Sequence, residues 1–155
     1  MVGVYYENGN FRSKGNYNND FINGFWVYYN PNGTLKSKGT FSNGKKNGLW
    51  LDYDLFGQKM KEQNYSNNIL NGLSKHFIQD SILIEKGNYM NGKRDGWFEF
   101  YNNDGTLREE CAYLSGLKNG GYRMYIDGYL FCEGTYENDE KIGVWKEYNS
   151  KGKII

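Results

Sequence analysis

Residues 89–107 read Tyr-Met-Asn-Gly-Lys-Arg-Asp-Gly-Trp-Phe-Glu-Phe-Tyr-Asn-Asn-Asp-Gly-Thr-Leu. An Asn-Gly turn, a short aromatic segment and a second Gly-containing turn follow one another in this stretch, which is typical of a β-hairpin. Its central glycine belongs to a series with steps of 24, 24, 24, 24 and 23 residues: Gly24, Gly48, Gly72, Gly96, Gly120 and Gly143. Five residues after each stands an aromatic: Tyr29, Tyr53, Phe77, Tyr101, Tyr125 and Tyr148. A fixed period of this length indicates an array of similar structural units.

The repeat glycines divide the chain into one array over residues 1–155. It consists of a partial unit 1–23, units 24–47, 48–71, 72–95, 96–119 and 120–142, and a partial last unit 143–155. Each unit reads as strand, turn, strand, turn, so that successive units pair edge to edge. We therefore predict an all-β fold, an elongated and twisted antiparallel meander of about fourteen short strands, in which each unit contacts mainly its neighbours.

Alternation along the second strand of each unit assigns its residues to faces. Positions eleven, thirteen, fifteen and seventeen after the repeat glycine are expected to share one face. Position fifteen is glycine in several units, for example Gly39 and Gly87. A glycine there leaves space for a neighbouring aromatic ring to lie over the backbone.

Composition narrows the possible functions. The chain is 38% hydrophobic and 18% aromatic, so aromatic rings are the main material for a core. Its net charge is +1, which gives no electrostatic basis for binding nucleic acid. The charge is uneven: residues 1–77 carry nine basic and five acidic groups, and residues 78–155 carry ten basic and thirteen acidic groups. No apolar run approaches the ~20 residues of a membrane-spanning helix.

Two cysteines, Cys111 and Cys132, fall on the second strands of successive units. An intervening strand would hold them ~9–10 Å apart, which is beyond the reach of a disulfide. Two free thiols favour a reducing compartment. Because the chain begins inside a unit, export after removal of a leader also stays open, and the sequence does not decide the localisation.

Catalytic chemistry is not indicated. The single histidine, His76, lies near Ser74 on one face of a predicted strand, which is a chance pairing for a nucleophile and a base. The adjacent acids Glu109 and Glu110 point to opposite faces, and zinc-binding spacings are absent. We expect no catalytic, cofactor or metal site. Departures from the repeat at Ser74, His76, Ser81 and Gly121 either mark a site or reflect drift in a tolerant array.

The stretch at residues 89–107 looks like the variant MORN repeat of bacteria, and residues 41–55 and 136–148 show the same pattern. The resemblance covers nearly the whole chain and implies the hairpin-repeat fold. Bacterial proteins with this repeat are often classed as antitoxin-like or immunity-like, which implies a binder that neutralises a partner toxin. Eukaryotic MORN proteins are similar in repeat and are linked to membranes, phospholipid and scaffolding. Neither class supplies a catalytic motif.

These considerations predict a non-catalytic protein-binding module, and the resemblance implies that it is antitoxin- or immunity-like. The alternatives are a membrane- or phospholipid-associated scaffold and a glycan-binding cell-surface module. Aromatic side chains are favoured anchors at interfaces. The candidate contacts are Trp26, Tyr28, Trp50, Tyr53, Phe98, Phe100, Tyr122 and Trp145. Alternation places them on two faces, and the sequence does not decide which face is exposed or whether open strand edges pair between copies.

Overall fold

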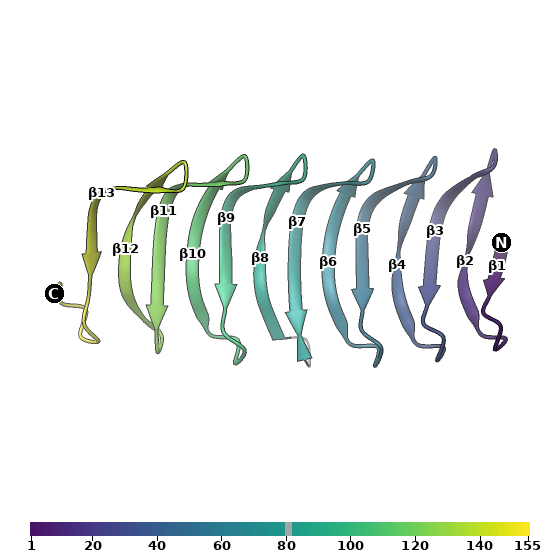
Figure 1. Cartoon of the computed structure of the whole chain (residues 1–155), viewed down its shortest axis with the longest axis horizontal. Coiled ribbons are helices and arrows are strands. Elements are labelled where there is room, and N and C mark those ends of the chain that lie inside the picture. The colour runs from purple at the N-terminus through teal and green to yellow at the C-terminus, as the bar shows by residue number, and fades with distance from the viewer. Residues whose placement is uncertain (80–81) are drawn as a thin grey trace.

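A computed structural model describes residues 1–79 and 82–155 as one open antiparallel sheet (Figure 1). Its strands follow each other in chain order, and the two termini lie at opposite ends of the sheet. The strands are β1 (Val2–Tyr5), β2 (Phe11–Asn18), β3 (Phe21–Tyr29), β4 (Leu35–Ser42), β5 (Lys45–Tyr53), β6 (Lys59–Ser66), β7 (Ile69–Ile78), β8 (Ile82–Met90), β9 (Lys93–Tyr101), β10 (Leu107–Leu114), β11 (Leu117–Ile126), β12 (Tyr129–Glu137) and β13 (Glu140–Glu147). This confirms the all-β meander. The described residues form thirteen strands rather than about fourteen, because the last expected strand is reduced to a bridge between Tyr148 and Ile154.

Two-residue turns join many neighbouring strands. In the turn between β4 and β5, Asn43 and Gly44 have φ angles of 47° and 77°. Positive φ at both central residues defines the tight turn whose twist matches antiparallel strands, and it favours Asn, Asp and Gly. The same pair of positive φ angles occurs at Asn19-Asp20, Asn67-Asn68, Asn91-Gly92, Ser115-Gly116, Asp127-Gly128 and Asn138-Asp139.

The repeat glycine has a backbone role that its spacing alone did not reveal. Gly48 has a φ of 77°, and the six repeat glycines span 64° to 110°. Gly48 lies where the pairing of β4 with β5 shifts register, between the Lys38–Leu51 and Thr40–Asn47 pairs. Such a bulge requires the left-handed conformation, which a glycine adopts at the lowest energetic cost.

Position fifteen behaves as predicted. A Cβ placed on Gly39 would collide with the indole of Trp50, so the ring lies directly over the glycine backbone. The indole nitrogen of Trp50 also donates a hydrogen bond to the carbonyl of Thr40, at 3.1 Å. The same ring-over-glycine contact recurs in Gly15–Trp26, Gly87–Phe98 and Gly134–Trp145. We call the side of the sheet that carries these rings the ring face.

One expectation about the faces is wrong. The pairing of β3 with β4 shifts between Tyr28–Ser37 and Tyr29–Leu35, which leaves Lys36 as an extra residue. This bulge moves position eleven to the face opposite positions thirteen, fifteen and seventeen. In the next unit the position-eleven residue, Lys59, accordingly forms an ion pair of 2.6 Å with Glu62 on that opposite face.

We call this opposite side the charged face, because charged residues pair across it from strand to strand. Ion pairs there join Lys75 to Glu62, Lys86 to Glu99, Arg123 to Glu110 and Glu133, and Lys146 to Glu133. All of these side chains are partly exposed, so each pair contributes little to stability, on the order of 0–1 kcal/mol.

The cysteines are placed as predicted. Cys111 lies on β10 and Cys132 on β12, with β11 between them, and both thiols are free. Cys111 is buried, and burial raises the pKa of its thiol to about 11. A thiol with so high a pKa is protonated at neutral pH and therefore a poor nucleophile.

Candidate functional site: a basic hollow in the ring face

Two packed clusters fill the ring face. The first contains Trp26, Phe41 and Trp50, and the second contains Phe98, Cys111 and Tyr113. Rings within each cluster meet edge to face, for example Phe41 and Trp50 with centroids 4.8 Å apart. Such contacts add to the energy of burying aromatic surface. The rings of this face therefore hold neighbouring units together.

This packing changes the interpretation of three predicted contact residues. Trp26, Trp50 and Phe98 are 2%, 1% and 0% exposed. A side chain with so little accessible surface has almost none to present to a partner, so we assign these three to the core.

The other predicted contacts are half-buried. Tyr28, Phe100, Tyr122 and Trp145 lie on the ring face, where their rings pack against those of the core. Tyr53 lies on the charged face, where the ammonium of Lys38 is 5.7 Å from its ring centroid. The eight candidates are thus not one surface, although Tyr28 borders a hollow.

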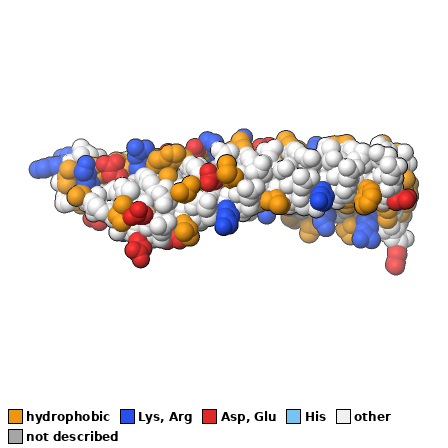
Figure 2. All heavy atoms as spheres, turned by 90° about the horizontal axis from the view of Figure 1, so that it is seen from above, with side chains coloured by type: hydrophobic (Ala, Val, Ile, Leu, Met, Phe, Trp, Pro, Cys, Tyr) orange, Lys and Arg blue, Asp and Glu red, His pale blue; other side chains and the backbone are white. Residues whose placement is uncertain are grey.

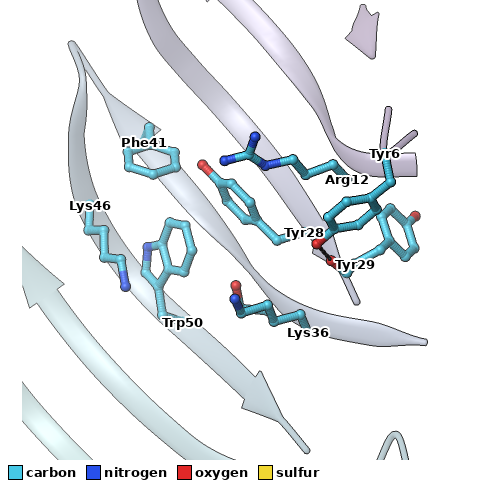
Figure 3. A pocket seen from close by; sticks show the side chains of 9 residues that line it. Tyr6, Arg12, Tyr28, Tyr29, Lys36, Phe41, Lys46 and Trp50 are labelled. Atoms are coloured by element: carbon cyan, nitrogen blue, oxygen red, sulfur yellow. Dashed lines mark hydrogen bonds between the residues drawn. The ribbon is translucent and has the colours of Figure 1, made fainter. Parts of the chain in front are cut away.

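The hollow lies over β2 to β5 and has a volume of about 300 Å³. Figure 3 shows the ring of Tyr28 among three cationic side chains, Arg12 from β2, Lys36 from β4 and Lys46 from β5. The remaining lining residues are Tyr6, Tyr29, Ser37, Phe41 and Trp50. We call this site the basic hollow. Among the residues that the structure describes, no carboxylate lines it.

Electrostatics in the basic hollow favour an anion. Arg12 and Lys36 are exposed, and within residues 1–79 and 82–155 neither forms an ion pair, nor does Lys46. The ammonium of Lys46 lies 4.3 Å from the centroid of the Trp50 ring, so the indole holds it in place. Burial raises the pKa of Tyr28, which keeps its phenol protonated and able to donate a hydrogen bond.

Two of these cations share one structural cause. Arg12 and Lys36 are the extra residues of equivalent bulges, in β2 and β4, and they stand 24 residues apart. Aligning the units would have revealed basic residues in the same phase. Their convergence on one hollow depends on the bulges, whose positions the residue types alone do not specify.

A polar cluster separates the two aromatic clusters. Here Gln63 stands where most other units have glycine and unit 96–119 has Cys111, and Ser74 stands where the other units have a ring; both are buried. The Gln63 amide nitrogen donates a hydrogen bond to the Ser74 hydroxyl at 3.3 Å and lies 3.3 Å from His76 Nε2. Ser74 and His76 therefore share a face, as predicted, and both contact Gln63.

The polar cluster continues to Glu85, which lies 3.8 Å from His76 Nδ1 and 2.7 Å from Arg94. Burial lowers the pKa of His76, and the carboxylate of Glu85 opposes that shift. Ser81, another departure from the repeat, lies outside the described residues. Within the described ranges, no three His, Cys, Asp or Glu side chains gather as metal ligands. The part of the chain that the structure describes has no helix long and apolar enough to cross a membrane.

Comparison with known proteins supports the repeat assignment. A family model described as the MORN repeat variant matches residues 4–19 and 23–43, which lie in β1 to β4. A comparison with curated proteins found no match. The match covers less than half of the chain and supports an array of MORN-like hairpin repeats, which suggests a binding role.

Proposed function

We propose that this chain is a non-catalytic protein-binding module that neutralises a partner protein, as antitoxins and immunity proteins do. The observation that carries the proposal is the basic hollow. Three cations surround aromatic rings there, and the described part of the chain contributes no carboxylate to the lining. Arg, Tyr and Trp are the side chains most enriched at the energetic centres of protein interfaces.

The partner segment that fits this hollow is acidic and carries an apolar or aromatic side chain. Carboxylates would bind Arg12 and Lys36, and the apolar side chain would pack against Tyr28 in the wall of the hollow. The excess positive charge of residues 1–77 would speed association with such a segment. The partner we propose is a toxin-like protein that presents this segment.

Capture and growth experiments test the proposal together. Immobilised wild-type protein and the Arg12→Glu/Lys36→Glu variant are incubated with a lysate of the source organism. Lys151→Glu/Lys153→Glu serves as a control with the same charge change in an exposed C-terminal segment. We expect one stoichiometric protein that binds the wild type and the control and is lost from the Arg12/Lys36 variant. Expressed alone, that protein should arrest growth, and co-expression of the wild type should restore it.

Capture that does not depend on Arg12 and Lys36, or a captured protein that is harmless to cells, would contradict the proposal. The alternatives have their own measurements. Co-sedimentation with anionic phospholipid vesicles, lost in the Arg12/Lys36 variant, would identify the hollow as a headgroup site. Binding on a glycan array would instead support the cell-surface module.

A further inference from the structure

The charged face carries an exposed apolar stripe. It is formed by the residue directly after each repeat glycine, which points away from the rings because strand side chains alternate. The members and their exposed fractions are Phe25 (57%), Leu49 (50%), Leu73 (37%), Trp97 (48%) and Val144 (80%). Successive positions of the stripe lie two strands apart, or ~9.6 Å, and the position between Trp97 and Val144 is occupied by Gly121. The stripe therefore runs across the strands along the long axis of the sheet, whose narrow profile Figure 2 shows.

The stripe has a socket at the position where its remaining member is glycine. A hollow of about 260 Å³ lies at Gly121, between Trp97 and Val144, and Arg123, Glu133 and Lys146 also line it. A Cβ on Gly121 would lie 2.8 Å from Cη2 of Trp97, so a side chain there would occupy this space. The guanidinium of Arg123 lies 5.8 Å from the centroid of the Trp97 ring and forms part of the wall. We call this site the Gly121 hollow.

Charges beside the stripe differ between its ends. Near Trp97 and Val144 the acids Glu99, Glu110 and Glu133 are matched by Lys86, Arg123 and Lys146 in ion pairs. Near Phe25 the flanking cations are Lys14 and Lys38, and in the described parts of the chain both lie over aromatic rings without an ion pair. The uncompensated charge along the stripe is therefore positive and is located at its Phe25 end.

We propose that the stripe docks an amphipathic α-helix of a partner protein, laid across the strands. One apolar residue in every seven meets a stripe residue, a bulky side chain enters the Gly121 hollow, and acidic residues face Lys14 and Lys38. This goes beyond the proposed function, because the stripe and the basic hollow lie on opposite faces of the sheet and bind different segments.

A helix fits the stripe for two physical reasons. Seven helical residues advance ~10.5 Å, close to the ~9.6 Å between stripe positions, so one heptad corresponds to one step and the offset reaches only ~4.5 Å, less than one helical turn, over five steps. A helix also satisfies its own backbone hydrogen bonds, whereas the face of a sheet, unlike its edge, offers none to an extended segment. From Phe25 to Val144 the stripe spans ten strand spacings, ~48 Å, or about 32 helical residues.

Synthetic helices provide the probe. One peptide of about 35 residues carries Leu at the first and fourth positions of each heptad and Trp at the fifth heptad's first position, which faces Gly121 when the first heptad faces Phe25. Glu flanks the Leu residues in its first two heptads, and a second peptide is a scramble of the same composition. Fluorescence anisotropy should show that the patterned peptide binds the protein saturably and that the scrambled peptide does not. Gly121→Leu, which fills the hollow, should weaken it by about tenfold or more, and so should Val144→Asp at the exposed end.

The controls separate this proposal from the preceding one. The Arg12→Glu/Lys36→Glu variant should bind the patterned helix as the wild type does, because its changes lie on the ring face. Circular dichroism melting checks that each variant is folded. If Gly121→Leu does not fold, the affinity of the Val144→Asp variant tests the proposal instead. Three results would overturn the inference: no binding up to about 0.5 mM peptide, equal binding of the scramble, or unchanged affinity in folded Gly121 and Val144 variants. A dimer by light scattering that Val144→Asp dissociates would assign the stripe to a second copy instead.

Discussion

Two places on the ring face fill equivalent space between neighbouring strands with different pairs of residues. At Gly39 and Trp50 a bare backbone supports a large ring, whereas at Gln63 and Ser74 a long amide meets a small hydroxyl. Both pairs lie in one row across the sheet, because Trp50 is opposite Gln63 and Gln63 is opposite Ser74. The repeat therefore constrains the combined size of two side chains on neighbouring strands rather than the identity of either one.

The two solutions differ in what they contribute. The ring buries a large apolar area and packs against its neighbours, while the amide and hydroxyl mainly satisfy each other's hydrogen bonds. The polar cluster consequently divides the ring face into two aromatic clusters. We expect the strongest coupling between units within each cluster and the weakest across Gln63 and Ser74.

Removing the ring should have the largest effect. Trp50→Ala deletes a fully buried side chain and leaves a cavity over Gly39, so we expect the free energy of unfolding to fall by about 3–5 kcal/mol. Ser74→Ala removes one hydrogen bond in a similar environment and should cost about 1 kcal/mol. Urea unfolding followed by circular dichroism measures both. Equal losses would show that the rings do not dominate the stability.

Exchanging the pairs sharpens the comparison. Ser74→Trp alone places a ring against Gln63 and should cost about 1–3 kcal/mol through overpacking. Adding Gln63→Gly should recover most of that loss, because the pair is then a glycine and a ring, as at Gly39 and Trp50. We expect a coupling energy of about 1–3 kcal/mol in this double-mutant cycle. Strict additivity of the two changes would contradict the idea that the repeat constrains these two side chains jointly.

The smallest effect should come from the protonation of His76. Burial lowers its pKa below the usual value of about 6.5, Glu85 opposes the shift, and Lys61 and Arg94 add to it. In the window between the two pKa values the unfolded chain binds a proton that the folded chain does not. The free energy of unfolding should therefore decrease as the pH falls through about 6.5 and level off below the folded-state pKa.

Urea unfolding between about pH 5 and 8 measures this slope. The His76→Gln variant, which keeps a polar side chain beside Gln63, should lose it. The partly buried Glu62 and Glu99 have lowered pKa values and titrate below this range, so they do not obscure the result. A slope that persists in His76→Gln would assign the pH dependence to another group.

Much of the fold was predictable because the period of the sequence reflects the period of the sheet. The turn at Asn91-Gly92 and the space over Gly39 followed directly from residue types. The face of position eleven did not, because one bulge residue such as Lys36 reverses the alternation. The site was predicted less well. Rings that the sequence suggested as contact residues, such as Trp50, are buried in the core. Arg12 lines the basic hollow because it is the extra residue of a bulge.

The order of the strands has a further consequence for how the protein folds. Every strand pairing in the described residues joins neighbours in the chain, and partners such as Gly24 and Phe41 are 17 residues apart. Closing such short loops costs little chain entropy, so no distant segment must be found before structure can form. Any hairpin within an aromatic cluster can serve as a starting point, and the rest can zip outward from it. On the ribosome, the first units can fold while the last are still being synthesised.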